Sequence, residues 1–244
     1  MCAIQNSFQR IEKKYIMTYN QYEAMRRGMC GHVKPDAYSR YSIGNVYCDT
    51  ENYALIRTSL DKPIYKEKLR LRSYGIPDSR TPVFVELKKK YEGVVYKRRV
   101  TVDAAEAACC IRREKLRSSD QISREINWFL QNYMPRPAAF IGYDREAWAG
   151  IEDEELRITF DTNLRGRDWD LDLRAGDSGE LFFPPDCVLM ELKLAGGAPM
   201  WLAKLLSENE IFSSSFSKYG SYYRCMIGQA PIYGVFGLEA KCYA

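Results

Sequence analysis

Hydrophobic and polar positions alternate along much of this chain, and a period of two predicts β-strands. The clearest case is YKEKLRLRSY at residues 65–74, where Lys66, Lys68, Arg70 and Arg72 occupy every second position. Further strands are predicted at 10–17, 41–50, 83–91, 93–102, 140–145, 155–162 and 188–194. The pair 83–91 and 93–102 reads as a hairpin around Glu92-Gly93. Most of these strands therefore have an apolar face and a charged face.

Helices are predicted between the strands. Thr18 and Gln21 have the spacing of a capping box, so a helix is expected to begin there. Asp103 is expected to cap a second helix, and an amphipathic pattern predicts a third over about 119–133. Pro199 suits the first turn of a fourth helix. Strands interspersed with helices indicate an α+β fold.

The composition fits a folded chain with a sizeable core. The chain has 244 residues, of which 46% are hydrophobic, and no shift in composition divides it, so we expect a single domain over residues 1–244. Its eight cysteines show no C-x-x-C spacing and there is one histidine, which disfavours a zinc site or a disulfide framework and favours a cytoplasmic location. The start of the chain lacks the apolar core of a signal peptide, and no apolar run reaches the length of a membrane span.

The charge is unevenly distributed. The net charge is only +4, but residues 62–99 contain twelve Lys or Arg against four acids, which suggests an anionic partner. An antiparallel sheet with one solvated face would explain any single charged strand. However, like charges destabilise one another on a sheet, and here cations dominate one face of most strands. A closed antiparallel barrel, with its charged face inside and helices outside, would instead enclose a basic interior that suits a polyanion.

Seven stretches together resemble a known family. These are IEKKY, YKEKLRLRSYG, VFVELKKKYEGVVYKRR, LRITFDTNLRGRD, VLMELKL, PMWL and SFSKYG, in that order. The set is similar to the VTC domain, the polyphosphate polymerase branch of the CYTH-like triphosphate tunnel metalloenzymes, over roughly residues 8–220. The resemblance implies an antiparallel tunnel barrel of about eight strands, a divalent cation (Mn2+ or Mg2+) and a triphosphate substrate in the interior.

The resemblance also implies roles for individual residues. Phosphate-binding positions fall on Lys14, Arg70, Arg72, Lys88, Lys97, Arg157 and Arg167, with Arg165 an alternative to Arg167 because the spacing there is ambiguous, and Lys68 shares the charged face. Glu191 matches the metal-binding position, with Glu12 as a second candidate ligand, and Lys218 matches a lysine near the transferred phosphoryl group. Arg70, Arg72, Glu191 and Lys218 are therefore the expected catalytic residues.

Two departures from the family pattern bear on the reaction. Arg10 stands where hydrolytic relatives carry a glutamate, which favours the polymerase branch, and Ser215 replaces a lysine of the fungal polymerases. The expected activity is transfer of the γ-phosphate of a nucleoside triphosphate onto inorganic polyphosphate or a pyrophosphate primer. ATP is the expected nucleotide.

Other functions remain open at this point. A metal-dependent tri- or polyphosphate hydrolase and a non-catalytic polyphosphate or inositol-polyphosphate binding module are the alternatives. Nucleic acid is disfavoured as a partner, because exposed aromatic residues do not interleave the cations. Family polymerases can be coupled to translocation, so a membrane partner protein is one expectation. The Tyr-rich segment after Gly220 is either a closing helix or an interaction surface.

Overall fold

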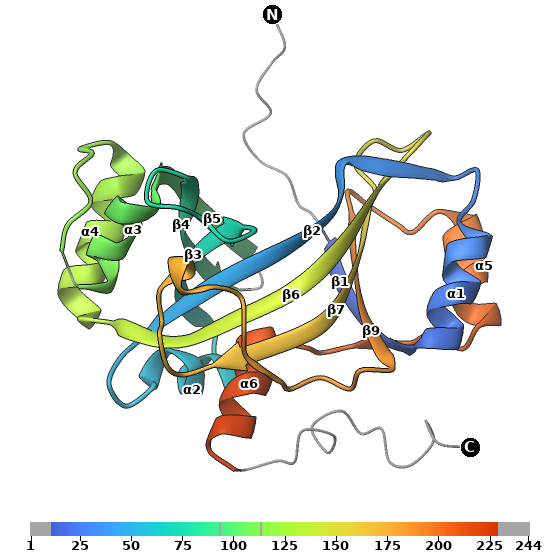
Figure 1. Ribbon diagram of the computed structural model, residues 1–244. Coiled ribbons are helices and arrows are strands. Elements are labelled where there is room, and N and C mark those ends of the chain that lie inside the picture. Colours follow the sequence, from blue (N-terminus) through green and yellow to red (C-terminus); the bar gives the residue numbers. More distant parts are fainter. Residues whose placement is uncertain (1–10, 93, 113, 229–244) are drawn as a thin grey trace, which may run out of the picture.

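One antiparallel sheet organises the protein (Figure 1). The computed structural model describes residues 11–92, 94–112 and 114–228. The strands are β1 (Ile11–Thr18), β2 (Val33–Asp49), β3 (Tyr65–Tyr74), β4 (Pro82–Tyr91), β5 (Val94–Asp103), β6 (Arg136–Gly150), β7 (Arg157–Arg167), β8 (Glu180–Leu181), β9 (Cys187–Leu194) and β10 (Ser213–Ser214). They are hydrogen-bonded in the order β10-β1-β9-β7-β6-β2-β3-β4-β5, and β8 pairs with β7. The alternation at residues 65–74 thus predicted its strand from end to end.

The helices connect these strands. They are α1 (Tyr19–Gly28), α2 (Ala54–Leu60), α3 (Ala104–Ile111), α4 (Gln121–Tyr133), α5 (Met200–Glu208) and α6 (Lys218–Met226). The capping box is confirmed, because Thr18 Oγ1 accepts from the Gln21 amide at 3.3 Å while Gln21 Oε1 accepts from the Thr18 amide at 3.0 Å. The predicted cap at Asp103 is also confirmed. None of the helices in the described part of the chain combines the length and apolar character that a bilayer crossing requires.

The sheet is open, so the expected closed barrel is not confirmed. Its two ends are β10 and β5, and no pairing joins them within residues 11–92, 94–112 and 114–228. The physical reason lies in β10, which has only two residues and cannot satisfy the backbone edge of the ten-residue β5. The expected number of strands is nevertheless close, since all strands other than β8 and β10 have at least eight residues.

Helices cover both faces of the sheet rather than the outside alone. On the apolar face, α3 and α4 pack on one core with residues such as Leu71 and Phe129, and α1 and α5 pack on another with Met25 and Met190. A third core lies on the opposite face, where Tyr219 and Tyr222 of α6 and Ile56 of α2 are buried. The last core shows that α2 and α6 cover part of the charged side of the sheet, where strand residues turn apolar.

Candidate functional site

The charged face of the sheet curls until its two ends approach each other. Burial alone would raise the pKa of Glu12 on β1, but Lys14 and then Lys88 on β4 lower it below its ordinary value. Lys14 in turn contributes to lowering the pKa of Lys68 on β3. Strands β1 and β4 each lie one position from opposite ends of the strand order. Charges on these distant strands therefore face a shared interior although the sheet does not close.

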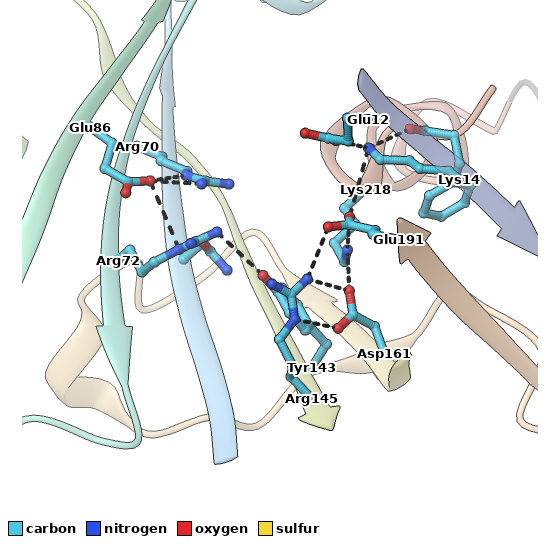
Figure 2. A network of polar contacts seen from close by, with 12 residues as sticks. Glu12, Lys14, Arg70, Arg72, Glu86, Tyr143, Arg145, Asp161, Glu191 and Lys218 are labelled. Atoms are coloured by element: carbon cyan, nitrogen blue, oxygen red, sulfur yellow. Dashed lines mark hydrogen bonds and ion pairs between the residues drawn. The ribbon is translucent and has the colours of Figure 1, made fainter. Parts of the chain in front are cut away.

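One half of this interior is built on β3, β4 and β5 around Glu86. The Glu86 carboxylate accepts from Arg70 Nε at 2.7 Å, Arg99 Nε at 2.7 Å and Lys97 Nζ at 2.7 Å. Glu86 is 1% exposed, and burial would raise its pKa, but Arg70, Arg72 and Lys97 hold the pKa far below the usual range. The carboxylate thus holds several guanidinium and ammonium groups side by side on one face of the sheet, of which Arg70 and Arg72 are shown in Figure 2.

The other half is a buried network around Asp161 and Glu191. Arg145 of β6 forms a bidentate pair with Asp161 of β7 at 2.6 and 2.7 Å, and it also donates to Glu191 of β9 at 3.2 Å. Lys218, the first residue of α6, donates to Asp161 at 2.6 Å and to Glu191 at 3.0 Å. Burial lowers the pKa of Lys218, but Asp161 and Glu191 outweigh it and raise the pKa above its ordinary value. Lys218 is therefore a fixed positive charge.

Arg72 and Tyr143 connect the two halves (Figure 2). Arg72 Nε donates to Asn45 Oδ1 at 3.1 Å, and Arg72 also donates to the Tyr143 hydroxyl at 3.4 Å. The Lys218 ammonium lies over the Tyr143 ring, 4.4 Å from its centroid. Arg72 is 8% exposed, so its guanidinium is held by the protein before any ligand arrives.

A group of lysines lies beside these clusters without carboxylate partners. Among the described residues, no carboxylate is within ion-pair distance of Lys66, Lys68 or Lys88. Lys68 donates to the Ser217 hydroxyl at 3.3 Å, while burial and the charges of Lys66, Lys88 and Lys14 lower its pKa to about 7. A polyanion would supply the negative charge that this part of the interior lacks.

Arg165 and Arg167 point away from this interior. Asn163 has a φ of 51°, and the β6–β7 register shifts there, so the alternation of side chains changes phase after Asp161. The Arg165 guanidinium donates to the Asp177 carboxylate at 2.7 Å. Arg167 is 1% exposed, and its guanidinium donates to loop carbonyl oxygens and lies over the Phe140 ring, 3.8 Å from the ring centroid. The structure does not bring either residue together with Arg70 or Lys218.

Arg157 precedes the register shift and stays on the charged side. It lies opposite Lys193 in the β7–β9 ladder, at the end of the sheet near the β6–β7 turn. Its guanidinium donates to the carbonyl oxygens of Glu154 and Leu156. Arg157 therefore contributes charge at one end of the interior rather than at its centre.

A comparison with models of known protein families shows which family the chain belongs to. The model of the VTC domain family matches residues 9–227. The chain belongs to the VTC domain family. This confirms the resemblance suggested by the seven stretches. No curated protein matches the chain significantly.

Solved structures agree on the fold of this VTC domain. An adenylyl cyclase candidate from Hippeastrum, described as having a dominant triphosphatase activity, has a TM-score of 0.55 at 15% identity over 89% of this chain and 96% of its own. An adenylate cyclase candidate from Bacillus halodurans has a TM-score of 0.52 at 12% identity over 85% of this chain and 93% of its own. These similarities show that the domain shares its overall fold with the two solved proteins.

Three residues of the VTC domain site were not anticipated. Tyr143, Arg145 and Asp161 form the centre of the network, yet sequence reasoning assigned none of them a role. A signal was present, because Asp161 continues the alternation of Arg157 and Thr159 along β7, and Arg145 follows Tyr143 at a spacing of two. A pattern of alternating cations does not by itself reveal the carboxylate that holds them, which here is Asp161.

The carboxylates offer a limited fit for a divalent cation. Glu12 and Glu191 occupy neighbouring positions in the β1–β9 ladder, where Glu12 pairs with Lys193 and Lys14 pairs with Glu191. Oxygen ligands suit Mg2+ or Mn2+, and Mg2+ commonly takes one or two carboxylates together with substrate phosphates and water. Within the described residues no group of three or more candidate ligands gathers, and Glu191 already accepts from Lys218 and Arg145. The protein thus provides one partial site that substrate oxygens would have to complete.

Proposed function

We propose that the protein is a phosphotransferase that lengthens inorganic polyphosphate with the γ-phosphate of a nucleoside triphosphate, and that ATP is this nucleotide. The observation that carries this proposal is the preformed row of Arg70 and Arg72 beside Lys218, next to lysines that lack carboxylate partners. Arg70 and Arg72 are two residues apart on one strand, so their guanidinium groups can hold successive phosphates. The lysines would hold the growing chain.

Charge neutralisation is the main task of these residues in the proposed reaction. Phosphoryl transfer passes through a loose transition state in which charge spreads over the transferred group, so positioning and electrostatic stabilisation dominate. Arg70 and Arg72 would orient the triphosphate, and Lys218 would stabilise charge at the transferred phosphorus. Glu12 and Glu191 would hold a Mn2+ or Mg2+ ion, which would neutralise phosphate oxygens when bound.

The proposed step needs no general base. A terminal oxygen of the polyphosphate chain, already anionic, forms a new bond to the γ-phosphorus. The bond between the γ-phosphorus and its bridging oxygen breaks, and the nucleoside diphosphate leaves with that electron pair. Hydrolysis would instead require a water molecule activated by a carboxylate or a metal ion. Several cations around Glu86 and Glu191 lower the pKa of each carboxyl against the opposing effect of burial, which makes these two residues weak bases and favours the polymerase.

A tri- or polyphosphate hydrolase is the second candidate. The dominant triphosphatase activity ascribed to the similar Hippeastrum protein favours it. The two reactions share a substrate and differ in the acceptor, which is a phosphate oxygen in one case and water in the other. An assay that measures both products separates them.

The test is incubation of the purified protein with ATP and Mn2+, with and without pyrophosphate. Long chains are read on a gel stained for polyphosphate, and free phosphate is measured in parallel. We expect chains from the wild type, and their loss in Arg70→Ala and Lys218→Ala. Arg98→Ala and Lys204→Ala are matched controls, because Arg98 is 41% exposed and pairs with Glu125, and Lys204 is 74% exposed. Free phosphate without chains would identify a hydrolase, and tight polyphosphate binding without either product would identify a binding module.

A further inference from the structure

The β4–β5 hairpin ends in an exposed apolar surface. We define the tip patch as Ile64, Tyr65, Tyr91, Val94, Val95 and Tyr96, which are between 45% and 69% exposed. Tyr65 pairs with Tyr91 across β3 and β4, and Tyr91 pairs with Val94 across the hairpin, so these residues are neighbours. A gathering of exposed apolar residues on a soluble surface commonly marks an interaction site.

Trp128 extends the tip patch along the apolar face of the sheet. It is 54% exposed on α4 and lines a shallow surface hollow with Lys89 and Glu125. Lys89 pairs with Tyr96 in the β4–β5 ladder, which places Trp128 beside the patch. Three tyrosines and a tryptophan thus surround the end of one hairpin. Tyr and Trp are the side chains that concentrate at membrane–water interfaces, because each has an apolar ring and a polar group.

Cations surround the tip patch. Lys66 and Lys90 pair with each other on the charged face just behind it, and Lys62 is close enough to Lys66 to lower the pKa of that ammonium, together with burial. On the other face, Lys89 and Arg98 share the carboxylate of Glu125. Lys89 also contacts Glu67 at 3.7 Å, so Glu67 and Glu125 balance the two cations of that face. The positive excess around the patch therefore comes from Lys62, Lys66 and Lys90, although Glu92 lies in the turn. The partner that complements it is negatively charged.

Self-association through the free edge of β5 is disfavoured by the same charges. In the symmetric antiparallel register of two β5 strands, Arg98 of one copy would lie opposite Arg99 of the other, twice. Like charges directly opposite each other destabilise a sheet. A second copy is therefore a poor occupant for this edge.

We propose that the tip patch docks on a lipid surface that carries anionic headgroups. Its tyrosines, valines and Trp128 would lie at the interface, and Lys62 and Lys90 would face the headgroup charges. This proposal does not depend on the catalytic activity. It places one end of the charged interior against a membrane.

The test is co-sedimentation of the whole chain with vesicles of phosphatidylcholine alone or with 30% phosphatidylserine. We expect binding only with phosphatidylserine and weaker binding at high salt. Neutralising Lys62 and Lys90 with glutamine should weaken binding roughly 30-fold, since each cation near an anionic surface contributes about 1 kcal/mol and 1.4 kcal/mol is tenfold. The triple variant V94S/V95S/Y96S should also lose binding. These residues are about half exposed, so the folded state should survive the change.

Two controls make the result decisive. The variant M200S/F212S removes two exposed apolar residues, Met200 at the start of α5 (83% exposed) and Phe212 four residues after its end (76% exposed). Helix α5 lies on the side of the molecule away from β4 and β5 (Figure 1), so this variant should bind vesicles like the wild type. Saturating tripolyphosphate should leave binding intact if the tip patch is responsible, because that ligand would occupy the charged interior. Loss of binding with tripolyphosphate, equal binding of the tip and control variants, or binding to an acidic protein but not to the vesicles would overturn the proposal.

Discussion

Replacing Asp161 by asparagine would leave two buried cations without their shared carboxylate. Asp161 is fully buried, and Arg145 and Lys218 contact it at 2.6–2.7 Å. Removing one member of a buried charge network typically costs about 3–5 kcal/mol, because the remaining charges stay desolvated. Asparagine keeps one oxygen acceptor and Glu191 still contacts both cations, so we expect a loss near the lower end, about 3 kcal/mol.

The loss is measured by urea and thermal unfolding followed by circular dichroism. For a chain of this size, about 3 kcal/mol corresponds to a fall in Tm of roughly 6–12 °C. Asp144→Asn is the matched control, because Asp144 pairs with Arg165 at 3.3 Å but its side chain is 44% exposed. An exposed pair of this kind contributes about 0–1 kcal/mol.

The difference between the two variants isolates the effect of burial. If Asp161→Asn unfolds with the same midpoint as Asp144→Asn, burial has not made the network costly to break. In that case the cations would be solvated in the folded state, and the inference of a pre-arranged charged interior would be wrong.

Two further predictions concern the same part of the molecule. The pKa of Lys68 is about 7 without a ligand, and a polyanion favours the charged ammonium. Tripolyphosphate should therefore bind more weakly at pH 8 than at pH 6, and its binding near pH 7.5 should be accompanied by proton uptake at Lys68. Calorimetry in two buffers of different ionisation enthalpy measures this uptake, and an unchanged pH dependence in Lys68→Met would contradict the assignment. Tyr219→Phe removes a 2.9 Å hydrogen bond to the buried carboxylate of Asp49 and should lower the free energy of unfolding by about 1.5–3 kcal/mol, as urea titration can show. The exposed Tyr38→Phe should leave that free energy unchanged.

Periodicity located eight strands and separated their two faces, but it found only part of the two longest, β2 and β6, which extend well beyond the predicted 41–50 and 140–145. Lys14, Arg70 and Glu191 were placed on one charged face because a strand allows no other arrangement of alternating side chains. Closure could not be predicted in this way, since it depends on whether an edge strand finds a partner. The two-residue β10 does not supply one.

The side of the sheet to which each side chain of β7 points could not be predicted from sequence spacing alone. Arg157, Arg165 and Arg167 are all odd-numbered and read as one face. Asn163 adopts a left-handed conformation at a register shift, and this reverses the direction of the side chains that follow. Asn tolerates such a conformation better than most residues, but its presence does not establish that a bulge forms.

The position of β1 constrains when the charged interior can exist. Lys14 lies opposite Glu191 on one side and opposite Ser214 on the other, so β1 pairs with strands that are synthesised long after it. A nascent chain that has reached β7 carries Asp161 and Arg145 but lacks Lys218 and Glu191, and its first strand has no neighbour. Assembly therefore waits for contacts between distant parts of the sequence, which slows folding and leaves strand edges exposed in the meantime. The network around Asp161 and Glu191 would be complete only when Lys218 of α6 is in place.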